Sequence, residues 1–338
     1  MNAFRKVFGR MRGSAGKSAD PDPRIRWFGK VPARGDYVAP AERPRWAQEF
    51  AEWMLAGWEA CLVDSYSPPV KLHEGFGLVR MPDTESTVIF VIRDMGGDQR
   101  GRSFPLALFC GVPTKSLPGP TPQIVPGLAL VIRELMRQFD AVARVVAANG
   151  VPGDCLQNSE VNLTNLLGTE NPAQPRVENS GDTFQMWFEE AITGADLDAG
   201  QWQARVEQWG AHLAAMAGGE FEPTLGFPLA RTFSWEQQVV AWLSWLNARL
   251  PLAPRNFQML VSSDPDRCPY ALSIVGRFPV ADDMMLLTSR YSDVKYVDHA
   301  ASQPPGEDNP VDSERDKFRT DDVAWTTFFM QERSGPAS

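Results

Sequence analysis

Residues 76–110 read FGLVRMPDTESTVIFVIRDMGGDQRGRSFPLALFC, and this stretch decides the fold. It holds three apolar runs, at 76–79, 87–92 and 104–110, and their β-branched and aromatic residues are typical of strands. Proline, aspartate and glycine separate the runs, and these turn-forming residues favour hairpins. The stretch therefore predicts three consecutive strands of an antiparallel sheet.

Two long amphipathic helices flank these strands in the sequence. Apolar side chains recur at helical spacing over residues 44–63 and again over residues 124–148. Asn149 and Gly150 then supply a helix stop. Together with a short strand at 26–31, the order β-α-β-β-β-α predicts the α/β (α+β) class, with an antiparallel central sheet and helices packed on it.

The chain length of 338 residues is typical of about two domains. We expect an α/β domain at 23–150 and a more helical C-terminal domain at 151–300. The predicted elements of the second domain are helices at 198–217 and from Ser234, and a hairpin of strands at 257–261 and 270–274.

Tails are expected at both ends of the chain. Residues 1–22 carry five basic side chains, which predicts either a flexible basic tail or a short amphipathic helix that touches a partner or a membrane surface. Residues 301–338 combine an acidic, proline-containing segment with an apolar patch at 323–330. We expect that patch to dock on the core or on a partner.

Composition excludes several classes of protein. The 33 Lys and Arg against 42 Asp and Glu give a net charge of −9, which disfavours binding to nucleic acid. No stretch approaches the length of apolar sequence that crosses a bilayer, so no integral membrane segment is expected. No apolar signal peptide is visible, and we expect a cytoplasmic protein. Nothing in the sequence sets its oligomeric state.

The sequence shows no pattern that carries catalysis. The three histidines are far apart, and the four cysteines lack the paired spacing of a zinc site. Cys61 and Cys110 lie in apolar segments and are predicted to be buried free thiols. No phosphate-binding glycine loop and no nucleophile elbow occurs. We therefore expect a protein that is not an enzyme and that needs no metal or cofactor.

Two motifs resemble the TagF (ImpM) family of type VI secretion-associated proteins. Residues 27–38, WFGKVPARGDYV, resemble the opening Phe-Gly-Lys-Leu-Pro-x-x-Gly-Asp-Phe signature of that family. Residues 98–106, DQRGRSFPL, are similar to its Asp-x-x-Gly-Arg-x-Phe-Pro-Leu segment, and residues 269–278 resemble a late strand element. The chain departs from the family at Gly96 and Gly97, which replace Ser-Val, at Val31, which replaces leucine, and in lacking a late Trp-Trp pair.

The resemblance implies regulation through protein–protein binding. TagF-like proteins are post-translational repressors of type VI secretion assembly and are linked to the forkhead-associated scaffold protein of that system. The resemblance also implies an N-terminal domain of the longin or roadblock kind, and a location in the cytoplasm or peripherally at the inner-membrane complex. The alternatives are a structural adaptor that remains in the apparatus and, less favoured, a hydrolase that uses Asp36, Asp98 and Arg102.

The first motif is predicted to make a turn at Arg34-Gly35-Asp36. Gly35 is expected to supply a positive φ, and Asp36 to hydrogen-bond the nearby backbone. Lys30 and Arg34 beside this turn are expected to form a partner-facing basic spot or to be solvated. A structural role for the turn is favoured over a binding role.

The second motif places Asp98, Arg100, Gly101 and Arg102 after a glycine turn. An acid flanked by arginines favours a charge-assisted network that fixes the hairpin, over an arginine presented to a phosphate or carboxylate on a partner. Phe104 and Pro105 follow in sequence. Proline at this point predicts an edge strand or the first residue of a strand.

Eleven tryptophans against five tyrosines is an unusual ratio. Trp46 and Trp53 share a helix face at i, i+7 spacing, and two further pairs, Trp202 with Trp209 and Trp235 with Trp242, do the same. These pairs are predicted to lie in the core. The tryptophans off these faces are candidates for exposed or partner-binding side chains, Trp325 first among them: Trp58, Trp187, Trp245 and Trp325.

Overall fold

The chain is described by a computed structural model. The residues that it describes are 22–62, 70–72, 74–117, 121–167, 224–230, 234–249, 257–263, 270–276, 278–288 and 297–298. The predicted helix at 198–217, both tails, Trp187 and Trp325 lie outside these residues, as does the side chain of Trp245.

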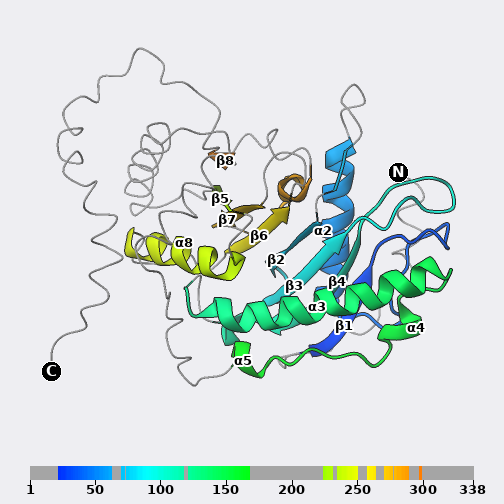
Figure 1. Ribbon diagram of the computed structural model, residues 1–338, viewed down its shortest axis with the longest axis horizontal. Helices are drawn as coiled ribbons and strands as arrows, with labels where there is room; N and C mark the ends of the chain where they lie inside the picture. Colours follow the sequence, from blue (N-terminus) through cyan, green and yellow to red (C-terminus); the bar gives the residue numbers. More distant parts are fainter. Residues whose placement is uncertain are drawn as a thin grey trace, which may run out of the picture.

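Eight strands are described. They are β1 (Asp22–Phe28), β2 (Glu74–Met81), β3 (Ser86–Arg93), β4 (Leu106–Pro113), β5 (Thr224–Leu229), β6 (Gln258–Ser263), β7 (Tyr270–Val275) and β8 (Val297–Asp298). They form one sheet in the order β1-β4-β3-β2-β6-β7-β5-β8 (Figure 1). All neighbours are antiparallel except β5 and β8, which are parallel. The predicted α/β class with an antiparallel central sheet is confirmed.

Helices cover both faces of the sheet. The longer ones are α2 (Arg45–Leu62), α3 (Ile124–Ala147) and α8 (Trp235–Arg249), and the shorter ones are α4 (Gly153–Leu156), α5 (Thr164–Leu167) and the 3₁₀ turns η1 (Thr114–Ser116) and η2 (Ala281–Leu287). Residues of α2 and η2 form the core on one face, and residues of α3 and α8 form it on the other (Figure 1). No helix within the described ranges is both long and apolar enough to cross a membrane.

The two covered faces explain the unbroken apolar run at 87–92. Successive strand residues point to opposite faces, so Ile89 and Val91 join the core under α3 while Val88 and Phe90 join the core under α2. A half-solvated strand would alternate with polar residues. Here both faces are buried, and every residue of β3 but Arg93 is buried.

The sheet runs from the N-terminal half of the chain into the C-terminal half. β2 pairs with β6, with Gly77 opposite Leu260 and Leu78 opposite Met259. On one face, Trp53 of α2 donates its indole N–H to the carbonyl of Val280, at 2.8 Å. The division expected at residue 150 therefore does not divide the sheet.

Four details of the structure differ from the sequence prediction. Pro105 lies one residue before β4 rather than at its first residue, and β4 is an inner strand rather than an edge, because β1 pairs with it. Strand β5, which contains Phe227, was not predicted. Trp58 is buried, so its prediction as an exposed tryptophan was wrong. Helix α3 ends at Ala147, one residue early, and Asn149 takes the positive φ of the helix stop.

The predicted core tryptophans are found in the core wherever the structure describes them. Trp46, Trp53 and Trp242 are buried, and Trp235 is half-buried against Phe76. Cys61 and Cys110 are buried free thiols, as the apolar segments around them predict.

Candidate functional site

The two sequence motifs meet at a buried ion pair. Lys30 follows the end of β1, and Asp98 lies in the loop between β3 and β4. The Lys30 Nζ lies 3.0 Å from Asp98 Oδ2, and the two side chains are 5% and 0% exposed. An ion pair with so little solvent around it is stable only when further hydrogen bonds satisfy both groups.

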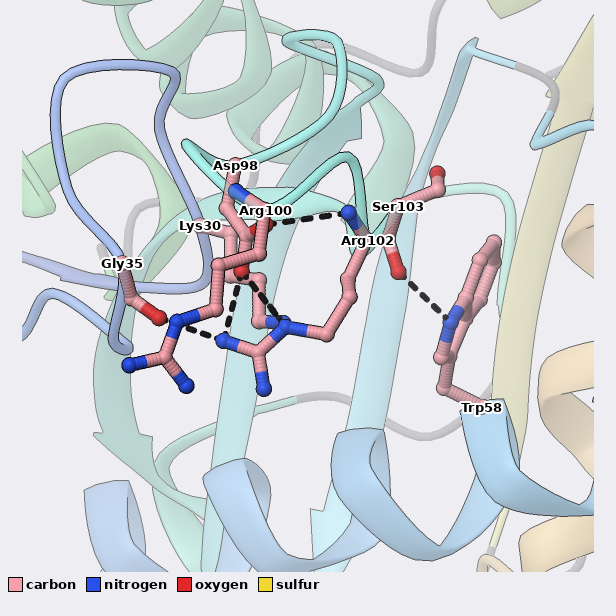
Figure 2. Close-up of polar contacts among 7 residues, drawn as sticks. All are labelled: Lys30, Gly35, Trp58, Asp98, Arg100, Arg102 and Ser103. Carbon is pink, nitrogen blue, oxygen red and sulfur yellow. Dashed lines mark hydrogen bonds and ion pairs between the residues drawn. The ribbon is translucent and has the colours of Figure 1, made fainter.

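Those further hydrogen bonds come from the loop that carries Asp98. The backbone N–H groups of Arg100 and Arg102 donate to Asp98 Oδ1, at 2.8 and 2.9 Å. The Arg102 Nε donates to Oδ2 at 2.9 Å, beside the Lys30 ammonium (Figure 2). The carboxylate thus accepts from two amides and two cations, and it fixes the loop from within.

This arrangement sets the charge of Asp98. Burial alone would raise the pKa of Asp98, but the hydrogen bonds from the Arg102 amide, from Lys30 and from the Arg102 side chain outweigh it. The pKa of Asp98 is therefore held well below its usual range. Asp98 stays ionised at any pH at which the protein would work.

The Asp98 loop is also tied to the turn of the first motif. Arg102 Nη2 donates to the carbonyl of Gly35 (Figure 2). The Gln99 side chain donates to the carbonyl of Ala33 at 2.8 Å. These contacts span 67 and 66 residues of sequence. The two motif loops therefore form one structural unit, which we name the motif knot (residues 29–38 and 96–105).

Aromatic side chains pack beneath the motif knot. Tyr37 stacks on Phe28 at 5.4 Å and meets Phe104 edge to face at 4.8 Å. The Lys30 ammonium lies 5.0 Å from the centre of the Tyr37 ring, within cation–π range. Burial raises the pKa of Tyr37. Trp58 of α2 donates its indole N–H to the carbonyl of Ser103 at 3.1 Å, so α2 supports the same loop (Figure 2).

Glycine is required where the two loops cross. Gly29 has a φ of +152°, and a Cβ placed on it would lie 2.1 Å from the carbonyl oxygen of Pro105. No larger side chain fits such an approach without moving backbone. The Phe-Gly-Lys and Phe-Pro elements of the two motifs are thus in direct contact through Gly29 and Pro105.

A groove of about 990 Å³ opens beside the motif knot. Its wall includes Arg34, Gly35 and Asp36 from the turn and Gln99 from the Asp98 loop. Residues of β1 and of the segment around α4 also line the groove. Asp98 and Arg102 do not line this groove.

The structure tests the roles predicted for Lys30, Gly35 and Asp36. Lys30 is buried and paired, so the prediction that it is solvated or faces a partner was wrong. Gly35 has no positive φ; Gly96 and Gly101 of the second motif do. Asp36 is exposed and makes no hydrogen bond with any described residue, so its predicted backbone bond is absent.

The second motif forms the charge-assisted network that was favoured for it from the sequence. Asp98 and Arg102 form the charge-assisted network, while the side chain of Arg100 is exposed and bonded to none of the residues described. Phe104 and Pro105 are buried beneath the network.

The residues of the hydrolase alternative do not make a catalytic group. Asp98 and Arg102 pair at 2.7 Å, but Asp36 lines the groove without them. A nucleophile or proton carrier needs a free oxygen and a pKa near the working pH. Both oxygens of Asp98 accept hydrogen bonds, and its pKa is far below that range. Across the described ranges, His, Cys, Asp and Glu nowhere gather in a group that could hold a metal.

Sequence reasoning missed Gln99, Tyr37 and Trp58 as parts of this unit. Tyr37 and Gln99 lie inside the motifs, but only the folded loops show that they connect one motif to the other. Trp58 contacts Ser103 across 45 residues of sequence, and no local pattern encodes that contact.

The chain is a mixed α/β protein with helices on both faces of an antiparallel sheet. Its candidate site, the motif knot, lies next to β1, the strand at one edge of that sheet. No known protein-family profile matches the chain, and no curated protein matches it significantly. Among solved structures, it is similar to the crystal structure of PA0076 from Pseudomonas aeruginosa PAO1. The two are 14% identical, with a TM-score of 0.36, over 85% of this chain and 100% of that one.

Proposed function

We propose that this protein is an accessory regulator of a bacterial type VI secretion system. In this role it binds another component of the system, with the forkhead-associated scaffold as the first candidate, and represses assembly after translation. It works in the cytoplasm or at the inner-membrane complex, without catalysis, metal or cofactor.

One observation supports this proposal above the others. The two motifs that carry the TagF resemblance lie about 70 residues apart, yet Lys30 and Asp98 join them in a buried ion pair. Residues that match a family pattern at two separate places are expected to touch when they serve one structural purpose. The contact brings the two matched segments together in the fold, which sequence similarity alone does not show.

The adaptor alternative assigns the same surfaces to a permanent contact. It predicts that the protein copurifies with baseplate or membrane-complex subunits in a fixed ratio. A repressor instead binds its target transiently and is absent from the assembled apparatus.

The proposal is tested in two steps. The purified protein should capture the forkhead-associated scaffold of its own host in a pull-down. Overexpression should lower secretion through the system, and deletion should raise it. Unchanged secretion in both strains would reject the repressor, and a constant ratio to apparatus subunits would favour the adaptor.

A further inference from the structure

Three arginines surround Gly35 at the outer end of the motif knot. We name them the arginine rim: Arg34, Arg100 and Arg102. Arg102 Nη2 donates to the Gly35 carbonyl, and a Cβ placed on Gly35 would lie 3.9 Å from Arg100 Nε. In the view of Figure 2 the guanidinium groups of Arg100 and Arg102 lie side by side below the loop that carries Asp98.

Of the three rim side chains, Asp98 holds Arg102 in place, and Arg34 and Arg100 are unpaired among the described residues. Asp98 fixes Arg102 through its Nε and Nη2, yet the Arg102 side chain remains 48% exposed and its Nη1 bonds to no described residue. The side chains of Arg34 and Arg100 are exposed and have no hydrogen bond or ion pair with the described part of the chain. The fold therefore presents donors that are aimed outward and unused.

The charge around Gly35 has the opposite sign from the protein as a whole. The four basic side chains Arg34, Arg100, Arg102 and Lys30 lie near three acidic ones, Asp36, Glu59 and the buried Asp98, on a chain whose net charge is −9. Like charges held together repel, and an anion placed between them relieves that repulsion. Guanidinium groups bind carboxylates through paired hydrogen bonds, so the rim suits a carboxylate ligand.

The groove continues from the rim. Arg34 and Gly35 belong to both, and Gln99 lines the groove next to Arg100. The charged side chains that line the groove are three arginines and three acids, so its walls carry no net charge: Arg24, Arg26, Arg34, Asp36, Glu42 and Asp154. A ligand that fills it needs acidic groups only at the rim end.

We propose that the arginine rim and the adjoining groove bind an extended, acidic peptide segment of a partner protein. A glutamate or aspartate of that segment contacts Arg100 and Arg102 at Gly35, and the neighbouring residues lie in the groove. The inference rests on the proposed partner-binding function, because it names the surface and the chemistry of the partner.

The test uses the full chain and a fluorescent synthetic peptide of alternating glutamate and threonine, about ten residues long, which its own charge keeps extended. Peptide binding is measured by anisotropy. The double substitution Arg34→Glu with Arg100→Glu should weaken binding by about tenfold or more, because it reverses the charge of two of the three rim arginines. The side chains of these two arginines make no hydrogen bond or ion pair with the described residues, so the melting temperature should not change.

Two controls keep the result specific. Lys115→Glu reverses one charge, half of the change in the double variant, at an exposed residue of η1 outside the groove, and its binding should stay within about twofold of the parent protein. A peptide with glutamine in place of glutamate should bind at least about tenfold more weakly, because it lacks the charge that guanidinium groups recognise. Equal weakening by Lys115→Glu would show general attraction and overturn the proposal.

Competition identifies the occupant. The chain has its own acidic segment at 301–322. If neutralising its acids strengthens peptide binding by about tenfold, that segment is the occupant and a partner peptide is not. A scaffold that binds the parent protein and the rim variant equally overturns this inference and leaves the proposed function standing. If the peptide binds at the rim but no scaffold binds the protein, the proposed function is overturned and this inference stands.

Discussion

Three side chains, Lys30, Asp98 and Arg102, carry the contacts that hold the two motif loops together. Asp98 is the centre, since both of the others donate to Oδ2 and the loop amides fill Oδ1. Arg100 contributes its backbone N–H to this arrangement, and its side chain makes no hydrogen bond or ion pair with the described residues.

Removing Arg102 should therefore cost stability, while removing Arg100 should not. Arg102→Ala loses the hydrogen bonds to Asp98 and to the Gly35 carbonyl, and we expect a loss of about 1–2 kcal/mol in the free energy of unfolding. Arg100→Ala is the matched control and should match the parent protein. Thermal and urea unfolding measure both. Equal stabilities for the two variants would show that Arg102 does not brace the loop.

Asp98 should make the protein sensitive to acid. Its pKa in the folded state is depressed below the value of about 3.9 expected in the unfolded chain. A depressed pKa contributes stability that is complete above the unfolded value and is lost as the pH falls below it. Asp98→Asn should be less stable than the parent protein at pH 7, and the difference should narrow below about pH 4. Urea unfolding across this pH range measures it, and parallel pH curves would contradict it.

At the site, the sequence predicted the charge-assisted network around Asp98 but did not predict that Lys30 belongs to it. An acid followed by two arginines after a glycine turn was enough to predict a charge-assisted network, in which Arg102 rather than Arg100 pairs with Asp98 through its side chain. Lys30 could not be assigned to them, because a lysine next to a turn is more often solvated than buried. The missing information was spatial: only the crossing at Gly29 and Pro105 brings Lys30 to Asp98.

Among the described glycines, Gly77 leaves the least room for a side chain, and it lies where β2 pairs with β6. A Cβ placed on Gly77 would lie 2.0 Å from the carbonyl oxygen of Met259, so the two strands pack with no room for a side chain there. The pair joins the two halves of the chain, and the whole sheet depends on it.

Gly77→Ala should separate these strands. Because the obstacle is backbone, we expect a loss of about 3 kcal/mol in the free energy of unfolding. Gly101→Ala is the comparison, since Gly101 has a φ of +72° but open space around it, and it should lose only about 1 kcal/mol. Denaturant unfolding ranks the two, and the reverse order would show that β2 and β6 adjust easily.

The elements that the sequence predicts well are those with a strong period. Helices α2 and α3 carry long apolar stripes, and their observed ends lie within one residue of the prediction. Strand β5 was missed because Gly226 and Pro228 interrupt it, and both residues weaken a strand pattern. Trp58 was misplaced because it lies off the main stripe of α2, yet it is buried under the loop at Ser103.

Across the whole molecule, one sheet contains strands from both of the domains that the chain length favours. The pairing of β2 with β6 cannot be read from either half by itself, because it joins residues far apart in the chain. The helices follow the same rule: Gly127 of α3 packs against Leu166 of α5, beyond the expected boundary.

A fragment of residues 1–150 should therefore fail to fold as a stable unit. It would leave the β6-facing edge of β2 unpaired and uncover the face of α3 that meets α5. We expect it to aggregate or to bind a hydrophobic dye, and to lack a cooperative unfolding transition, whereas the full chain has one. A soluble fragment with a sharp transition would show that the N-terminal half is an independent domain.

The β2–β6 pair also has a consequence for how the protein is made. Gly77 leaves the ribosome about 180 residues before Leu260, which at a synthesis rate of roughly 5–20 residues per second is a delay on the order of ten seconds or more. During that delay the edge of β2 that pairs with β6 remains unpaired. A chaperone that shields nascent chains should thus affect the yield of this protein more than its small size would suggest.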